Sequence, residues 1–581
     1  MSYIISFDKQ KQIIDKLNYL FPDEDSLSVY AEIEKLIDKY SGLISKKDTK
    51  SWLDEKDVFL ITYGDSIKSK SQSPLKTLHN FLNKYLDGYI KYVHILPFYP
   101  YSSDDGFSVI DYFKVNEGLG NWNDIEDMSD DFKLMFDAVI NHISAKSDWF
   151  QEYLKGNPEY NNYFIETENS PELTKVTRPR NLPLLTKFNT TSGEKSLWTT
   201  FSEDQIDLNF KNPATFLKII ELLLFYVSKG AKSIRLDAIG FMWKEIGTNC
   251  MHLPQTHKAI QLYRDIFDIV APETLIITET NVPHKDNISY FGNGNNEAQL
   301  VYQFPLPPLV LFSFISGTAE YLSKWADSLE LVSDRTTFFN FLASHDGIGV
   351  IPTTGILTDK QREIMVEHVK SNGGYVSNKI TPDGKEIPYE LNINYFNAIS
   401  DKNVSLDINI NRFIASQSIL LSIIGVPAIY IHSILGSQNY SDGVKETGRF
   451  RSINREKICS DMLDEELLTP TSLRNKILTQ YKKLLKIRQA QKAFHPNAYQ
   501  KVIFINNSIF ALHRQSQSGN ENIFALVNVY SSKLDIEFQP SVYGVNAHIF
   551  RELVSDTELR SKNDKISVCM RPYQVMWISE I

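Results

Sequence analysis

Cysteine is scarce in this chain of 581 residues, which contains three: Cys250, Cys459 and Cys569. They are odd in number and far apart in the sequence, and none has the spacing of a metal-ligand pair. This pattern favours a reducing compartment over a disulfide scaffold. We therefore expect a cytoplasmic protein.

Long uninterrupted hydrophobic runs are also missing. The first residues lack the basic stretch and apolar core that mark a signal peptide. The most apolar stretch, 414–436, is interrupted by Gln417, Pro427 and His432. A membrane span needs about 20 predominantly apolar residues. We predict a buried helix and strand there, and no association with a membrane.

Excess positive charge is absent as well. Lysine and arginine total 61, aspartate and glutamate total 71, and the net charge is −10. A general surface for nucleic acid has to be basic, so we expect no nucleic-acid partner. If the protein binds anions, it must do so in a local basic pocket.

The chain does contain a series of eight short apolar segments, each followed by a stretch with helical periodicity. Strands this apolar, separated by helices, are typical of a parallel sheet covered on both faces. Eight such units predict an α/β fold, the (β/α)₈ or TIM barrel. The expected strands lie at 58–66, 90–99, 134–142, 233–241, 275–282, 300–307, 336–346 and 426–435.

The remaining segments predict insertions and two flanking parts. The first residues are amphipathic and predicted to be helical, and they carry no chemical motif. From about residue 497, short alternating segments predict an antiparallel β domain. The predicted division is a helical extension (1–56), the barrel (57–142, 226–346 and 411–496), an inserted domain after the third strand (143–225), an inserted loop region after the seventh (347–410) and a C-terminal β domain (497–581).

Charged residues interrupt the fourth expected strand, SIRLDAIGF, at Arg235 and Asp237. Residues two apart in a strand point to the same face, and burying both charges is costly unless they pair or act chemically. A structural ion pair is the simpler interpretation of these two residues alone. Other expected strands, however, also end in polar side chains, at Asn141-His142, Glu279 and His345-Asp346.

In a (β/α)₈ barrel these strand ends form one rim, where active sites lie. Asp237 and Glu279 follow adjacent strands, so their carboxyl groups can approach to about 5 Å, the separation of the two acids in retaining glycosidases. One acid would then be a nucleophile and the other a general acid/base. Arg235 would favour the ionised nucleophile, burial would favour a protonated Glu279, and Asp346 would bind sugar hydroxyls.

Five motifs follow one another in the chain: DGFSVIDY (105–112), DAVINH (137–142), IRLDAIGF (234–241), ITETN (277–281) and LASHDGIG (342–349). They resemble motifs of the α-amylase superfamily of glycoside hydrolases and, within it, of the sucrose phosphorylase subfamily. The resemblance runs from about residue 57 to the C-terminus. It implies a nucleophile at Asp237, a general acid/base at Glu279 and a transition-state stabiliser at Asp346. Amylases often carry calcium, but no loop rich in aspartate requires it here, so no metal is predicted.

The resemblance also implies a subsite that binds glucose. Several of its side chains have a simpler structural interpretation: Phe107 as a core aromatic, His142 as a strand-end histidine and Gln205 as a loop residue. The implied residues are Asp104, Phe107, His142, Gln205, Arg235, His345 and Arg451, the last from RSINR (451–455).

Two loops indicate which members of the subfamily the chain resembles. Sucrose phosphorylases have glutamine after the tyrosine of the loop PYELNINYFNA (388–398), whereas Glu390 follows Tyr389 here. They also have histidine two residues after the acid/base, where this chain has Asn281. Together with TRPRNLPLLT (177–186), these residues look like those of glucosylglycerate phosphorylases, in which the glutamate is expected to bind a glyceryl hydroxyl. Phosphorylases of glucosylglycerol share the glutamate and are the nearest alternative, followed by those of sucrose and sucrose 6′-phosphate.

Phosphorolysis requires cations on the acceptor side, because phosphate and glycerate are both anions. Arg178 and Arg180 are the expected ligands, since a guanidinium fork suits such groups. His284 and Lys285 are secondary candidates, and Lys285 is more simply a solvated surface cation. We expect small-molecule partners only, namely an α-glucoside, inorganic phosphate and glycerate. No cofactor is expected, because the nucleophile and the acid are side chains.

Two other functions fit parts of the pattern. A hydrolase or transglucosidase of the same fold would not depend on phosphate. A catalytically silent amylase-fold binding or transporter-accessory protein would tolerate loss of the three acids, which are present here, and usually needs a membrane anchor. The sequence leaves the oligomeric state open, a homodimer included.

Overall fold

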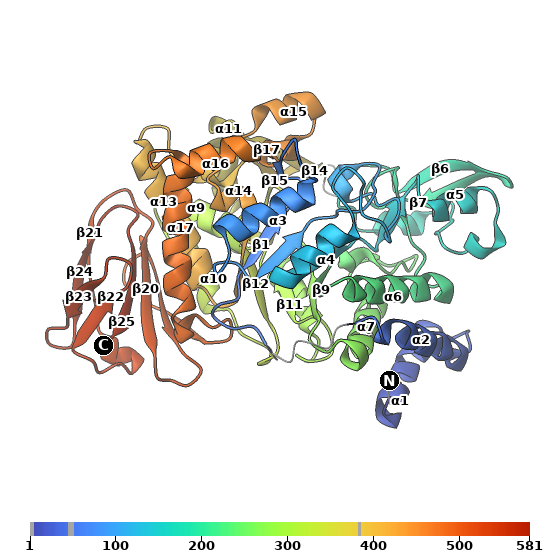
Figure 1. Ribbon diagram of the computed structural model, residues 1–581, viewed down its shortest axis with the longest axis horizontal. Helices are drawn as coiled ribbons and strands as arrows, with labels where there is room; N and C mark the ends of the chain where they lie inside the picture. Colours follow the sequence, from blue (N-terminus) through green and yellow to red (C-terminus); the bar gives the residue numbers. More distant parts are fainter. Residues whose placement is uncertain (1–4, 45–51, 381–384) are drawn as a thin grey trace.

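A closed barrel of parallel strands forms the centre of the protein in a computed structural model that describes residues 5–44, 52–380 and 385–581. Each barrel strand in this part of the chain pairs with the strands that precede and follow it, and the last pairs with the first (Figure 1). The predicted (β/α)₈ fold is thus confirmed. The strands are β1 (Phe59–Thr62), β3 (Tyr92–Ile95), β4 (Lys133–Ala138), β9 (Ala231–Leu236), β10 (Leu275–Thr278), β11 (Leu300–Tyr302), β12 (Thr337–Phe341) and β16 (Val426–Tyr430).

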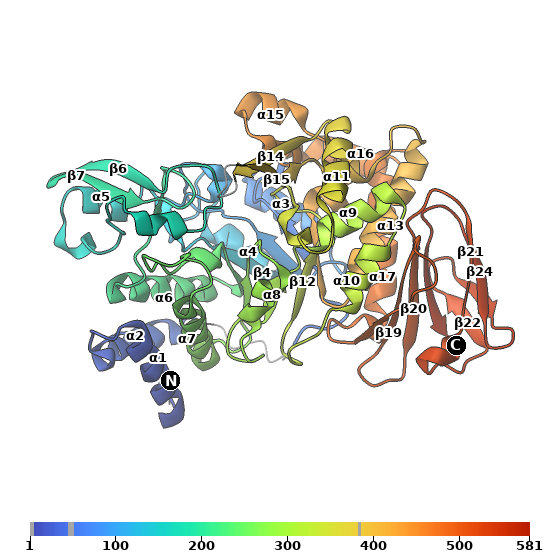
Figure 2. The same ribbon diagram turned by 180° about the vertical axis from the view of Figure 1, so that it is seen from behind.

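Helices between the strands cover the outside of the barrel (Figures 1 and 2). α6 (Pro213–Ser228) begins where the side chain of Asn212 accepts a hydrogen bond from the N–H of Ala214, with proline at the first helical position. Its sequence is unusually apolar because it packs both on β9 and on a further helix. Other helices of this layer are α3 (Pro74–Tyr85), α4 (Trp122–Asp131), α7 (Pro254–Val270), α9 (Leu306–Ser316), α13 (Leu406–Ser422) and α17 (Leu473–Gln489).

Two long excursions leave the barrel at the carboxyl ends of β4 and β12. The first contains the pair β5 and β8 and the hairpin β6–β7, and the second contains α11 and a sheet of β13, β15 and β14. The insertions predicted at 143–225 and 347–410 extend into α6 and α13, which cover the barrel, and residues 381–384 lie outside the described residues. The elements are β5 (His142–Ser144), β6 (Leu185–Thr190), β7 (Gly193–Trp198), β8 (Gln205–Asp207), β13 (Ile348–Gly349), α11 (Asp359–Ser371), β14 (Tyr375–Ile380) and β15 (Glu386–Asn392).

Two helices precede the barrel, α1 (Phe7–Leu20) and α2 (Ser26–Ser41). α1 packs on α7 and α2 on α6, so they form a further layer on one side of the barrel (Figure 1). The first is also held by charge, because Lys9 and Lys16 lie 3.0 and 2.6 Å from the carboxylate oxygens of Asp265 on α7. Residues 1–4 and 45–51 of the predicted helical extension lie outside the described residues.

An antiparallel β domain lies at the other end of the molecule, as predicted for the C-terminal segment (Figure 2). Its larger sheet has the order β18-β19-β20-β25-β22-β23, and β21 pairs with β24. α13 of the barrel packs against β20. The strands are β18 (Tyr499–Val502), β19 (Ile509–Gln515), β20 (Asn522–Asn528), β21 (Leu534–Phe538), β22 (Ile549–Glu552), β23 (Thr557–Arg560), β24 (Ile566–Met570) and β25 (Val575–Glu580).

A search for membrane spans is negative. None of the helices in the described parts of the chain combines the length and the apolar character needed to cross a bilayer.

The docking of α1 should depend on its buried apolar face. Leu17 is fully buried, whereas Phe7 at the start of the same helix is 77% exposed. Leu17→Ala should weaken the docking by about 2–5 kcal/mol, the usual cost of such a truncation in a packed core. We expect limited proteolysis to cleave this variant between α1 and α2 faster than wild type, and Phe7→Ala to behave as wild type. Equal cleavage rates in the two variants would contradict this account of the packing.

Candidate active site

The polar strand ends meet around a cavity of about 120 Å³. The residues that the sequence indicated for catalysis or substrate binding line it, except Arg178 and the secondary candidates His284 and Lys285. The lining comes from the carboxyl ends of barrel strands, from the two excursions and from the loops that follow β3 and β16. The predicted residues that line it are Asp104, Phe107, His142, Arg180, Gln205, Arg235, Asp237, Glu279, His345, Asp346, Tyr389, Glu390 and Arg451.

Asp237 and Glu279 lie side by side because each is the first residue after one of two paired strands, β9 and β10. Arg235 Nη1 donates to Oδ1 of Asp237 at 2.7 Å, and its Nη2 is 3.8 Å from Oε2 of Glu279. The backbone N–H of Ala238 donates to the same Oε2 at 3.0 Å. Ala238 has a left-handed φ of 46°, a conformation that costs energy for a residue with a side chain.

Burial raises the pKa of both acids. It raises the pKa of Asp237, against the opposing effect of Arg235 and with the help of Glu279, to about 7. It also raises the pKa of Glu279, which Arg235 opposes. Arg235 binds Asp237 directly and lies farther from Glu279, so it favours the ionised form of Asp237 more strongly than that of Glu279.

Arg235 also binds the fully buried Asp137, which in turn contacts the fully buried His94. Its Nη1 also donates to Oδ1 of Asp137, and Oδ2 of Asp137 is 2.6 Å from Nε2 of His94. Burial alone would raise the pKa of Asp137, but Arg235 and His94 outweigh it and lower that pKa. Burial lowers the pKa of His94, so a neutral imidazole donates its Nε2–H to an ionised Asp137. Arg235 is thereby fixed in its direction toward Asp237.

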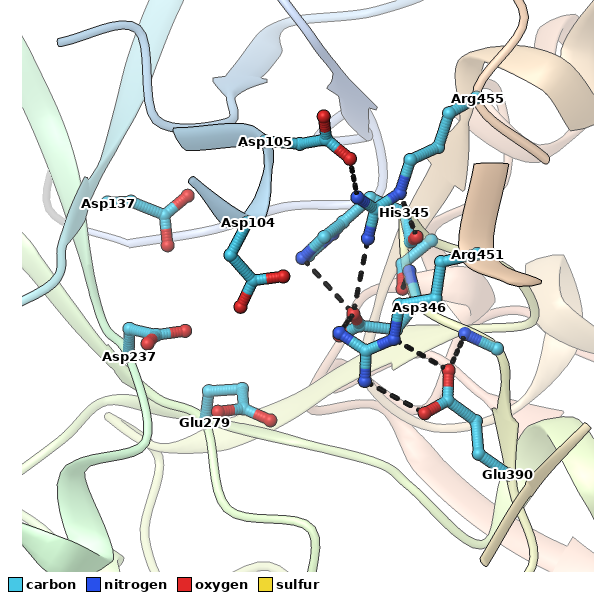
Figure 3. A network of polar contacts seen from close by, with 12 residues as sticks. Asp104, Asp105, Asp137, Asp237, Glu279, His345, Asp346, Glu390, Arg451 and Arg455 are labelled. Carbon is cyan, nitrogen blue, oxygen red and sulfur yellow. Dashed lines mark hydrogen bonds and ion pairs between the residues drawn. The ribbon is translucent and has the colours of Figure 1, made fainter. Parts of the chain in front are cut away.

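Arg451 joins two acids on the other side of the cavity (Figure 3). Its Nη1 lies 2.6 Å from Oδ1 of Asp346, and its Nε and Nη2 donate to the two oxygens of Glu390 at 2.9 and 2.8 Å. The N–H of Gly347 also donates to Glu390 at 2.5 Å, and a Cβ at this glycine would lie 2.6 Å from Cγ of Glu390. Burial raises the pKa of Asp346, but Arg451 and its neighbours lower it far below the usual range.

Phe107 forms part of the wall and is held by three polar residues. Its ring stacks on the imidazole of His345, with centroids 4.8 Å apart and planes 6° from parallel. Its carbonyl oxygen lies 2.8 Å from Nε2 of His142 and accepts from Nε2 of Gln205 at 2.9 Å. One face of Phe107 is thus covered by His345, which sequence reasoning did not anticipate.

The predicted basic loop enters the cavity through only one of its two arginines. Arg180 Nη2 donates to Oδ2 of Asp104 at 2.9 Å, and its guanidinium lies over the ring of Phe201. Arg178 lies outside the lining, although its Nε and Nη2 are buried without a hydrogen-bond partner among the described residues. The secondary candidates His284 and Lys285 also lie outside the lining, His284 half-buried and Lys285 exposed.

The arrangement combines a carboxyl group aligned by a guanidinium, a second carboxyl group beside it and a third across the cavity. A pair of neighbouring carboxyl groups is what double displacement at an acetal carbon uses. Over residues 5–44, 52–380 and 385–581, no group of three or more histidine, cysteine, aspartate and glutamate side chains is placed to hold a metal ion.

Comparison with known proteins agrees with this chemistry. The family described as "Alpha amylase, catalytic domain" matches residues 84–373. The chain is 46% identical over 573 residues to the glucosylglycerate phosphorylase of Spirochaeta thermophila, with 97% of each chain covered. It is 44% identical over 571 residues to that of Escherichia coli K12, covering 98% of this chain and 100% of the other. The chain belongs to the α-amylase superfamily.

Within that superfamily the identities group the chain with the glucosylglycerate phosphorylases. Among solved structures, sucrose 6F-phosphate phosphorylase from Thermoanaerobacter thermosaccharolyticum superposes with a TM-score of 0.72 at 24% identity, covering 89% of this chain and 98% of that one. At this identity the likeness shows a shared α-amylase-type fold.

Sequence reasoning missed four residues of this superfamily member that shape the site. Asp137 opens the motif DAVINH, where a charge next to apolar residues was the available signal, and Arg455 closes RSINR, the polar motif that also supplied Arg451. His94 lies within the apolar segment of the second strand, where a lone polar residue was a weaker signal. Phe201 lines the cavity from the first excursion, and nothing in its sequence context marked it.

The buried imidazole of His345 should make stability depend on pH. Burial lowers its pKa in the folded protein to about 3, whereas an unfolded histidine titrates near about 6.5. Between these values the unfolded state binds the extra proton, so stability falls with decreasing pH by up to about 1.4 kcal/mol per unit. The substituted side chain in His345→Asn does not titrate. Lowering the pH from about 7 to about 5 should therefore reduce the thermal midpoint of the variant less than that of wild type. A difference between the two midpoints that does not change with pH would contradict the lowered pKa of His345.

Proposed function

We propose that this protein is a retaining glycoside phosphorylase that reversibly converts 2-O-α-glucosylglycerate and phosphate into α-glucose 1-phosphate and D-glycerate. The observation that carries the proposal is the pair of Asp237, which Arg235 aligns, and Glu279, which we assign as the protonated acid because it lies farther from Arg235. It occurs in a chain that shares close to half of its residues with relatives named glucosylglycerate phosphorylase. Asp346 and the predicted lining residues other than Arg180, Tyr389 and Glu390 are assigned to the binding of the glucosyl unit.

In the first step Oδ2 of Asp237 attacks the anomeric carbon, because Oδ1 is engaged by Arg235. The bond from that carbon to the glycerate oxygen breaks, and the proton of Glu279 moves to the departing oxygen. The product of this step is a β-glucosyl ester of Asp237 and free glycerate. Ionised Asp137 holds Arg235 in place while the charge on Asp237 is lost.

In the second step an oxygen of phosphate attacks the anomeric carbon from the face that glycerate left. The ester bond to Asp237 breaks, and Glu279, now a carboxylate, takes the proton of the attacking phosphate hydroxyl. Two inversions at the same carbon give α-glucose 1-phosphate with net retention. Asp346, kept ionised by Arg451, stabilises positive charge that develops on the ring in both transition states.

The acceptor side must accommodate anions next to Glu390. Both oxygens of Glu390 accept from Arg451, so its charge is already balanced, and a free lone pair can still accept a glyceryl hydroxyl. The proposed ligands of phosphate and of the glycerate carboxylate are Arg180, which lines the cavity, and Arg178, whose buried Nε and Nη2 have no hydrogen-bond partner among the described residues. Burial raises the pKa of Tyr389 to about 12, which keeps it a neutral donor there.

Because the cavity is assigned to a glucoside, phosphate and glycerate, we propose small molecules as the partners of this protein. We also propose a cytoplasmic location, on the basis of the low cysteine content. A homodimer stays a prediction. Phosphorolysis of glucosylglycerol or sucrose, and hydrolysis without phosphate, are the alternatives that the following experiment separates.

Reverse synthesis should identify the acceptor. α-Glucose 1-phosphate is supplied with D-glycerate, glycerol or fructose in separate reactions, and phosphate release is followed. We expect the largest kcat/KM with D-glycerate, because only this acceptor offers both a hydroxyl for Glu390 and a carboxylate for a guanidinium. Glu390→Gln should lower the value for glycerate by at least about tenfold, since the amide cannot keep both bonds to Arg451. Glu386→Gln, which changes an exposed glutamate of the same strand, is the control. A larger value with glycerol or fructose would refute the acceptor assignment.

The acid/base role is tested by the leaving group. Glu279→Gln should lower kcat/KM for glucosylglycerate by about 10²–10⁴-fold, because the departing oxygen lacks its proton. With α-glucosyl fluoride and phosphate the loss should be far smaller, since fluoride leaves without protonation. Asp237→Asn is the matched variant and should lose activity on both substrates. If Glu279→Gln lost both activities equally, Glu279 would not be the acid.

A further inference from the structure

The segment that carries Asp104 into the cavity has a strained backbone. Asp104, Asp105 and Gly106 have φ angles of 55°, 50° and 110°, all in the region that residues with side chains rarely adopt. At Gly106 a Cβ would lie 2.7 Å from the carbonyl oxygen of Pro97, so this position has no room for a side chain. Such a conformation persists only where surrounding contacts hold it.

Arg455 makes the contact that holds Asp105. Its Nη1 pairs with Oδ2 of Asp105, its Nε donates to the carbonyl oxygen of His345 at 2.8 Å, and its Nη2 lies 3.8 Å from Oδ1 of Asp346 (Figure 3). Its guanidinium also lies 5.7 Å from the ring centroid of Tyr63. The Arg455 side chain is only 5% exposed. Neither Arg455 nor Asp105 belongs to the lining of the cavity, so neither contacts a bound substrate.

These contacts connect two walls of the cavity. Asp105 is the neighbour of Asp104, and His345 precedes Asp346. The donors of a guanidinium lie in one plane with fixed directions, so one side chain that binds both walls sets their separation. A lysine would keep the charge and lose this geometry.

We propose that Arg455 is a positioning residue of the glucosyl subsite, which acts through Asp105 to hold the left-handed segment and so directs Asp104 toward the sugar. The inference rests on the proposed function, because it takes the cavity to bind a glucosyl unit. It predicts an effect on the binding of glucosyl donors that is separate from any effect on phosphate. A merely structural ion pair would change stability alone.

A second ion pair of the chain offers a matched control. Arg412 and Asp401 have side chains 5% and 36% exposed, against 5% and 38% for Arg455 and Asp105. Arg412 donates to the carbonyl oxygen of Phe314, and neither partner lines the cavity. Asp401→Asn therefore removes a comparable charge with no path to Asp104.

The test compares Asp105→Asn, Asp401→Asn, Arg455→Lys and the double variant of Asp105 and Arg455. Asparagine suits the left-handed conformation at least as well as aspartate, so Asp105→Asn changes the charge and not the backbone preference. α-Glucosyl fluoride is the donor and phosphate the acceptor, because this donor shares only the glucosyl unit with any natural substrate. KM for each, kcat and the thermal midpoint are measured for all variants.

We expect Asp105→Asn to raise KM for glucosyl fluoride by about tenfold, with KM for phosphate and kcat changed less than about threefold. Arg455→Lys should raise the same KM, and the double variant should raise it less than the sum of the two single effects, since Asp105 acts through Arg455, which also contacts His345 and Asp346. Asp401→Asn should leave every kinetic constant unchanged. An unchanged donor KM in Asp105→Asn, additive effects in the double variant, or an equal effect of Asp401→Asn would overturn the proposal. Wild-type protein that does not turn over glucosyl fluoride would overturn the proposed function as well.

Discussion

The buried guanidinium of Arg235 is the interaction on which the rest of the site depends. Transferring a charged group from water into the protein interior costs several kcal/mol unless charged or hydrogen-bonding partners compensate it. That cost is comparable to the net folding stability of a whole domain. Asp137 and Asp237 bind this guanidinium on neighbouring strands of the closed barrel, and Glu279 follows the next strand. Because the cation binds Asp237 directly and lies farther from Glu279, it favours the ionised form of Asp237 over that of Glu279. This difference is the basis of the proposed double displacement.

A second, half-buried cation performs the same balancing on the acceptor side. Arg451 lies between Asp346, which follows β12, and Glu390 of β15, and its fork binds Glu390 through two donors. The balance keeps Asp346 ionised and removes the repulsion that a bare Glu390 would exert on an anionic acceptor. Glu390 is further tied to the backbone at Gly347, where only glycine leaves space for it. Charge compensation, more than the presence of any one acid, thus defines what the cavity can accept.

The two sides of the cavity differ in what supports them. The groups proposed to react with the anomeric carbon follow short strands inside the barrel, which hold them within narrow limits. Arg180, Tyr389 and Glu390 come from the excursions, outside the closed barrel. The residues assigned to the acceptor are thus placed by segments other than those that place the reacting groups. Arg455 links the strained loop to the segment that follows barrel strand β12, because it binds both Asp105 and the carbonyl oxygen of His345.

By itself the sequence determined the barrel, the C-terminal β domain and the residues that surround the cavity. Apolar segments and helical periods are local patterns, and polar residues at the ends of consecutive parallel strands must meet at one rim. Only the tertiary structure decided which of these side chains touch: Phe107 stacks on His345, Arg451 binds Glu390, Arg180 binds Asp104, and Arg178 stays outside the lining. Such pairings join residues that are distant in the chain and depend on the course of long loops, for which sequence periodicity carries no information.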